Sequence, residues 1–233
     1  MTKNGMNAFE DIIGYSFKDK NLLSLALTHS SYSNENKKAG CSDNERLEFL
    51  GDAALDLIIS GYIYKSFPDM SEGELTKLRA GVVCESGISK TAREIRLGDF
   101  ILLGHGEEST GGRQRDSILA DAFEAVIGAV YLDGGIEETK RFVLSLMIPE
   151  INCVKDSFKL LDAKTHLQEL IQSQSKMPVN YIITDETGPD HDKIFTASVE
   201  HEDKILGEGK GKSKKEAEQA AAYDALKKLE SDI

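Results

Sequence analysis

Apolar residues recur every three to four positions over most of the first two thirds of the chain. This spacing places them on one face of an α-helix. Glycine and proline residues interrupt the pattern and mark turns between the segments. The pattern predicts helices over residues 9–13, 22–27, 45–64, 75–97, 118–132 and 139–151. We therefore expect residues 1–153 to form an all-helical domain.

The pattern changes after residue 153. Residues 154–160 are mostly polar and are predicted to be a linker. An amphipathic segment follows, then three short stretches in which apolar and polar residues alternate, which is typical of strands. A long helical segment ends the chain. The predicted elements are a helix at 162–174, strands at 180–185, 194–200 and 204–207, and a helix at 213–229. Residues 161–230 are thus expected to form a small α-β-β-β-α domain.

Acidic residues form a stripe on the predicted helix 45–64. At about 100° of rotation per residue, Glu45, Glu48 and Asp52 share one narrow face. Leu47 and Ile58 lie on the opposite face, which is the one expected to enter the core. The acidic stripe therefore belongs to a helix that is half buried.

A second pair of acids, Asp121 and Glu124, lies on the predicted helix 118–132. The small residues Ala125 and Gly128 stand beside them and would let another helix approach closely. Carboxylates gathered at low dielectric repel one another or take up protons unless a cation neutralises them. Ligands that are all oxygen favour magnesium or manganese. The two helices are predicted to form the two halves of one metal site.

Two of the nearby acids have a simpler explanation. Ser42 and Glu45 have the spacing of a capping box, which would satisfy free amides at a helix start. Glu72 is a further acid that is left outside the candidate site, because Ser71 or Glu72 could simply begin the next helix. Neither alternative applies to Glu48 or Asp52, because neither of them lies in the cap.

Phe49 lies beside the acids on the helical wheel, away from the apolar face. An aromatic side chain placed there has no core of its own chain to enter. We expect it to contact a second copy of the chain in a homodimer.

The bulk composition sets further limits. No apolar run approaches the roughly 18 residues of a membrane span, and the polar start lacks a secretory signal. A cytoplasmic protein without a membrane partner is expected. The cysteines Cys41, Cys84 and Cys153 are odd in number and widely spaced, which indicates reduced thiols and no structural zinc site.

Charge is unevenly distributed. The net charge of −12 argues against nucleic acid as a partner, because cations supply nonspecific affinity for phosphates. However, four lysines fall within six residues, which is either a phosphate-binding patch or a solvated surface: Lys210, Lys212, Lys214 and Lys215.

The glycine-rich segment 104–112 has no preceding strand pattern and no Gly-Lys-Ser/Thr ending, so a loop is expected there instead of a phosphate loop.

Several motifs resemble those of the bacterial ribonuclease III family, which is specific for double-stranded RNA. Residues 44–52 (Asn-Glu-Arg-Leu-Glu-Phe-Leu-Gly-Asp) are similar to the family's signature nonapeptide. Residues 121–125 (Asp-Ala-Phe-Glu-Ala) resemble its second acidic motif. Residues 167–169, 188–191 and 213–217 resemble a double-stranded-RNA-binding domain. The resemblance extends over nearly the whole chain.

The resemblance implies a magnesium-dependent endoribonuclease, with manganese as a possible substitute. It assigns Glu48, Asp121 and Glu124 as metal ligands, Asp52 near the attacking water or sharing a metal, and Glu45 as a weaker candidate. Products would carry 5′-phosphate and 3′-hydroxyl ends with short 3′ overhangs. Each subunit of a homodimer would cut one strand, with Phe49 at the interface. Ribosomal RNA precursors and some messenger RNAs would be substrates.

For the C-terminal domain the resemblance implies contacts to duplex RNA. The residues concerned are Gln168, His191, Lys212, Lys214 and Lys215. Gln168 and His191 could also be ordinary exposed residues. Where some relatives carry a further lysine, this chain has Glu218, which could weaken phosphate affinity or shift its salt dependence.

Two other functions are compatible with parts of the sequence. A noncatalytic double-stranded-RNA-binding dimer would need the lysines but not four juxtaposed carboxylates, which cost stability without a metal. A metal-dependent phosphohydrolase of small nucleotides would need the acids but not the second domain.

Overall fold

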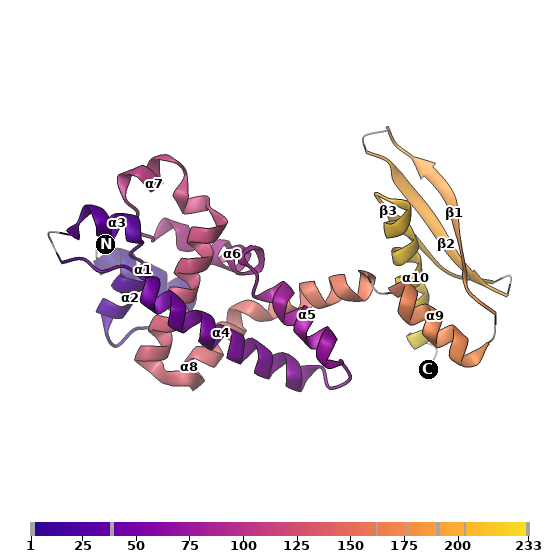
Figure 1. The fold of residues 1–233 in the computed structure, drawn as a ribbon, viewed down its shortest axis with the longest axis horizontal. Helices are drawn as coiled ribbons and strands as arrows, with labels where there is room; N and C mark the ends of the chain where they lie inside the picture. Colours follow the sequence, from indigo (N-terminus) through magenta and orange to yellow (C-terminus); the bar gives the residue numbers. More distant parts are fainter. Residues whose placement is uncertain are drawn as a thin grey trace. The chain divides into compact units, whose positions relative to one another are not determined.

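The computed structural model describes residues 3–37, 40–161, 163–175, 177–189, 192–202 and 204–231 (Figure 1). The chain divides into two compact units, Met1–Asn152 and Cys153–Ile233. The first unit is helical and the second contains a three-stranded sheet.

The first unit is built from helices joined by short turns, as the apolar spacing predicts. Its helices begin with α1 (Lys3–Ile13), α2 (Lys20–Ala26), α3 (Ser30–Glu35) and α4 (Glu45–Ser66). They continue with α5 (Glu72–Val82), α6 (Glu85–Glu94), α7 (His105–Ser109) and α8 (Asp116–Leu161). Two 3₁₀ turns, η2 (Leu97–Asp99) and η3 (Gly112–Gln114), lie on either side of α7.

Three predicted boundaries are corrected by the structure. The single helix expected at 75–97 is two helices, α5 and α6, because Cys84 between them is extended (φ −71°, ψ 157°). The helices expected at 118–132 and 139–151 belong to α8, which is interrupted where Gly135 adopts a left-handed φ of 77°. The linker expected at 154–160 is helical and continues α8.

The core of the first unit is centred on α8. Phe123, Val126, Ile127 and Val130 are fully buried along one face of this helix. Helix α4 contributes Leu47, Leu55 and Ile59 to the same hydrophobic interior, along with other buried residues. The two helices that carry the acidic residues are therefore fixed by the most deeply buried side chains of the unit.

The second unit has the predicted α-β-β-β-α order. It comprises α9 (Ala163–Gln174), β1 (Asn180–Thr187), β2 (Ile194–His201), β3 (Lys204–Gly211) and α10 (Lys214–Ser231). The strands form an antiparallel sheet in the order β1-β2-β3. Leu167 of α9, Val199 of β2 and Ala221 of α10 share one core. Glycine at Gly207 lets β3 approach α10, because a Cβ there would lie 2.5 Å from the Ala221 carbonyl oxygen.

Candidate active site and RNA-binding surface

Helices α4 and α8 cross with their backbones in contact. A Cβ atom at Gly51 would overlap the carbonyl oxygen of Glu124, and a Cβ at Gly128 would overlap that of Leu47. Only glycine fits at these two positions. The crossing point lies beside Glu48 and Asp52 on one helix and beside Asp121 and Glu124 on the other, so residues about seventy positions apart in sequence meet here.

Glu124 lies at the electrostatic centre of this group. Its pKa is raised to about 8, first by burial and then by the carboxylates of Asp52, Asp121, Glu48 and Asp56, in that order. A glutamate with such a pKa is largely protonated at neutral pH when no cation is present.

The pKa values of Glu48 and Asp121 are raised as well. Burial raises the pKa of Glu48, followed by the charges of Asp121, Glu45 and Asp52. Burial also raises the pKa of Asp121. The structure therefore brings Glu45, Glu48, Asp52, Asp121 and Glu124 within range of one another's charge, as the sequence predicts.

The chemistry of this donor set suits a divalent cation. Its oxygens all come from carboxylates, which hard cations prefer, and burial together with neighbouring negative charge raises the pKa of Glu48 and of Glu124. Within the described parts of the chain, no three His, Cys, Asp or Glu side chains converge closely enough to hold a metal ion as they stand. The assignment of individual ligands therefore stays a prediction.

The capping-box alternative for Glu45 is wrong. Asn44, and not Ser42, is the N-cap of α4, and its side chain makes no capping hydrogen bond. Instead, Asn44 Nδ2 donates to the Ala26 carbonyl oxygen at 3.1 Å. Glu45 is the first residue of α4 and is exposed.

For Glu72, by contrast, the helix-start explanation is confirmed. Ser71 is the N-cap of α5 and forms a capping box with Glu74. Glu72 is the first residue of that helix and accepts a hydrogen bond from Thr76 Oγ1 at 3.1 Å.

Three charged or titratable residues near the acids were not identified from the sequence. Asp56 contributes to the raised pKa of Glu124, and Glu85 to that of Asp121, whereas His29 lowers the pKa of Asp121. Asp56 is one turn beyond Asp52 on the acidic stripe, so helical spacing could have revealed it. His29 and Glu85 come from other elements, and no local pattern marks them.

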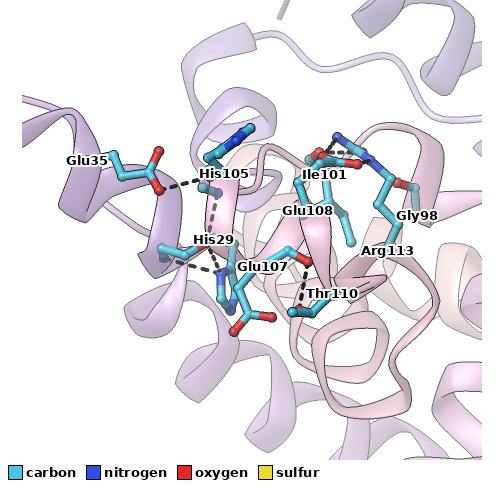
Figure 2. A network of polar contacts seen from close by, with 11 residues as sticks. His29, Glu35, Gly98, Ile101, His105, Glu107, Glu108, Thr110 and Arg113 are labelled. Carbon is cyan, nitrogen blue, oxygen red and sulfur yellow. Dashed lines mark hydrogen bonds and ion pairs between the residues drawn. The ribbon is translucent and has the colours of Figure 1, made fainter.

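His29 is held in place by the contacts around α3 and α7. Thr28 forms a parallel bridge with Leu102, and the His29 amide donates to the Leu102 carbonyl oxygen at 3.1 Å. His29 Nδ1 accepts a hydrogen bond from the Ser31 amide at 3.2 Å. Figure 2 shows His29 within this network, where Glu35 accepts from the His105 amide at 2.8 Å.

The glycine-rich segment 104–112 is more ordered than the predicted loop, since it contains α7 and the start of η3. Arg113 fixes its far end. Its guanidinium donates to both carboxylate oxygens of Glu108, at 2.7 and 2.5 Å, and to the carbonyl oxygens of Gly98 and Ile101, at 2.8 and 2.7 Å (Figure 2). These contacts anchor the segment that leads into α8.

Phe49 is 78% exposed, next to the acids on α4. Leu57 and Tyr64 are also exposed, at 65% and 72%, and helical spacing places both within about 80° of Phe49 around the axis of α4. The three side chains form an apolar stripe on the surface of the first unit. The interface role predicted for Phe49 is compatible with this stripe and stays a prediction.

The second unit presents cations at the start of α10. Lys212, Lys214 and Lys215 are exposed, and the last two lie in the first turn of the helix. Ser213 Oγ accepts from the Glu216 amide at 3.2 Å, and Glu216 accepts from the Lys212 amide at 2.8 Å. Free amides and the helix dipole favour an anion at such an end.

Gln168 and His191 are the other two residues predicted to contact RNA. Gln168 lies on α9 and is partly exposed. His191 lies outside the described residues.

Among the helices in the described parts of the chain, none is long and apolar enough to cross a membrane.

Comparison with known proteins matches both units to families. Residues 19–151 match the ribonuclease-III-like family, and residues 163–229 match the double-stranded RNA binding motif. The protein Ribonuclease 3 of Desulforamulus reducens is 52% identical over 96% of this chain and 91% of its own length. The chain belongs to the ribonuclease III family. Its predicted fold class and its assignment as an endoribonuclease are thereby confirmed.

Further relatives agree. Ribonuclease 3 of Bacillus cereus is 50% identical over 99% of this chain and 94% of its own length. The nuclease domain of ribonuclease III from Campylobacter jejuni superposes with a TM-score of 0.58 at 46% identity, and covers 64% of this chain and 97% of that domain. A second structure of that domain, with a TM-score of 0.56 at 47% identity over 60% of this chain and 94% of that one, is described as flexible in a region involved in dimer formation.

Proposed function

We propose that this ribonuclease III family member hydrolyses phosphodiester bonds of double-stranded RNA with magnesium, with manganese as a possible substitute. Products would carry 5′-phosphate and 3′-hydroxyl ends with short 3′ overhangs. Precursors of ribosomal RNA and some messenger RNAs, in the cytoplasm, are the proposed substrates. The observation that carries this proposal is the close approach of α4 and α8 at the Gly51–Gly128 crossing, which brings their carboxylates within range of one another's charge.

Glu48, Asp121 and Glu124 are the proposed metal ligands, and Asp52 would lie near the attacking water or share a metal. Glu45 would act from the exposed edge of the group. When bound, the metal lowers the pKa of water and stabilises the leaving 3′ oxygen. To act as a ligand, Glu124 would have to give up the proton that it holds at neutral pH without a cation. The raised pKa of Glu124 supports that role.

The second unit would recognise the shape of the duplex. Such modules contact successive minor grooves and the intervening phosphates over about 16 base pairs. Lys212, Lys214 and Lys215 would meet the phosphates, and Gln168 and His191 the minor grooves. The exposed cations at the start of α10 support this assignment.

We propose that the active protein is a homodimer. An apolar stripe of Phe49, Leu57 and Tyr64 is costly to leave in water, and it lies on the helix that carries Glu48 and Asp52. Two-fold symmetry would then place one acidic group at each strand of an antiparallel duplex.

Cleavage assays with different metals test this function. Purified protein is incubated with labelled duplex RNA or single-stranded RNA of the same sequence, in magnesium, calcium or chelator. We expect cleavage of the duplex in magnesium only, with 5′-phosphate product ends. Cleavage of single-stranded RNA at the duplex rate, or cleavage in chelator, would contradict the proposal.

A further inference from the structure

Glu218 is a negative charge in an unfavourable place. It lies one helical turn after Lys214 and Lys215 on α10, at the i+4 and i+3 positions. Side chains with this spacing are neighbours on a helix and pair when their charges are opposite. Glu218 could therefore pair with Lys214 or Lys215 and neutralise its charge at the N-terminus of α10, where phosphate is proposed to bind.

The structure shows a different partner. Lys164, at the start of α9, donates from Nζ to Glu218 Oε2 at 2.6 Å. Both side chains are partly buried, with 33% and 26% of their surfaces exposed. The ion pair joins the two helices of the unit, and partial burial protects it from solvent screening better than an exposed pair.

Neighbouring residues fix Lys164 in this position. Its Nζ lies 4.2 Å from the centroid of the Tyr181 ring, which favours a cation. Its backbone amide donates to Gln219 Oε1 at 2.9 Å, next to Glu218. Lys164 is thus held by β1 and α10 at the same time.

The lysines at the start of α10 have other surroundings. Lys214 Nζ lies 5.9 Å from the centroid of the Phe195 ring, and Lys215 is exposed. With Glu218 engaged by Lys164, the charge of these two lysines is directed to solvent, where phosphate would bind.

We propose that Lys164 and Glu218 are positioning residues for RNA binding. Lys164 neutralises Glu218 across the helix interface, and this keeps the charges of Lys214 and Lys215 available for phosphate. Lys164 acts through Glu218 and does not itself contact RNA. The inference rests on the proposed function of the α10 lysines.

A double-mutant cycle in the full-length chain tests this inference. The variants are Lys164→Gln, Glu218→Gln and the double variant. Fluorescence anisotropy measures their binding to a labelled RNA duplex in chelator, at several salt concentrations. We expect Lys164→Gln to bind roughly three- to tenfold more weakly, with a shallower salt dependence, because Glu218 then competes with phosphate. The double variant should bind nearly as well as the natural chain, since the neutral amide that replaces the Glu218 carboxylate needs no cation.

Two control variants separate this effect from simpler ones. Lys228→Gln removes the same charge and breaks the ion pair with Asp224 on the same helix, and we expect it to change binding less than Lys164→Gln. Lys164→Arg keeps the cation and should bind like the natural chain. Thermal unfolding of each variant verifies that the second unit is folded.

Three results would overturn the inference. A double variant as weak as Lys164→Gln would mean that Lys164 contacts phosphate directly. Unchanged binding in Lys164→Gln would mean that the pair has no influence. A Lys214→Gln/Lys215→Gln variant serves as reference. If this variant binds RNA normally, the proposed role of these lysines fails and this inference fails with it. If this variant binds weakly while Lys164→Gln binds normally, only the inference about Lys164 and Glu218 is overturned.

Discussion

Burial and neighbouring negative charges together raise the pKa of Glu124. Its pKa of about 8 arises first from desolvation and then from four neighbouring carboxylates. The sequence predicted the acids on each helix, because i, i+3 and i+4 spacing fixes which side chains share a face. It did not predict that the charge of His29 influences the pKa of Asp121, since local periodicity carries no information about tertiary pairing such as the bridge between Thr28 and Leu102.

The pKa of Glu124 predicts how stability changes with pH in the absence of a divalent metal. The pKa is raised in the folded chain from its ordinary value of 4.5, so the folded chain keeps a proton that the unfolded chain releases. The free energy of unfolding should therefore fall as pH rises from about 4.5 to 8, and this contribution should then level off. Glu124→Gln removes this contribution.

Urea unfolding of both proteins in chelator, from mildly acidic to mildly alkaline pH, measures the difference. We expect the natural chain to lose stability relative to Glu124→Gln over this range, and added magnesium to restore it. Parallel pH profiles for the two proteins would show that Glu124 is not buried among like charges.

At the scale of elements, helical spacing predicted most of the first unit and the order of the second. It missed the break between α5 and α6, because apolar residues continue across Cys84 in helical spacing although the backbone is extended there. It also missed α3 and α7, which are only six and five residues long and owe their position to contacts between them. The sequence indicates that Gly128 is a small residue beside the acids, but only the structure shows that Gly51 approaches it.

The crossing of α4 and α8 leads to a prediction about Gly51. In Gly51→Ala the new methyl group would overlap the Glu124 carbonyl oxygen, so the helices must separate and the acids with them. We expect a loss of about 1–3 kcal/mol in unfolding free energy and a large loss of cleavage. Chemical denaturation and the duplex-cleavage assay measure the two effects.

Gly73→Ala is the matched control. It lies in α5, and a Cβ there would meet no atom within 4 Å. We expect unchanged cleavage and a gain of roughly 0.4–1 kcal/mol from reduced freedom of the unfolded chain. If Gly51→Ala behaved like Gly73→Ala, the close approach of the two helices would be unimportant.

At the scale of the whole molecule, the chain joins a nuclease unit to a unit that recognises duplex RNA. The exposed side chains of Phe49, Leu57 and Tyr64 support the proposal that the nuclease unit forms a two-fold homodimer. In the proposed homodimer each subunit would supply one set of carboxylates, and each set would cut one strand. We propose that the carboxylates of α4 and α8 form this set.

The cleavage pattern of a mixed dimer shows whether the carboxylates of each subunit cut one strand. The natural chain and Glu124→Gln are co-expressed with different affinity tags, and the heterodimer is purified through both tags. On duplex RNA in magnesium, we predict that the heterodimer cuts one strand at each site and that the Glu124→Gln homodimer binds the duplex but cuts neither strand. Cleavage by the Glu124→Gln homodimer at a near-normal rate, or cutting of both strands by the heterodimer, would contradict the account.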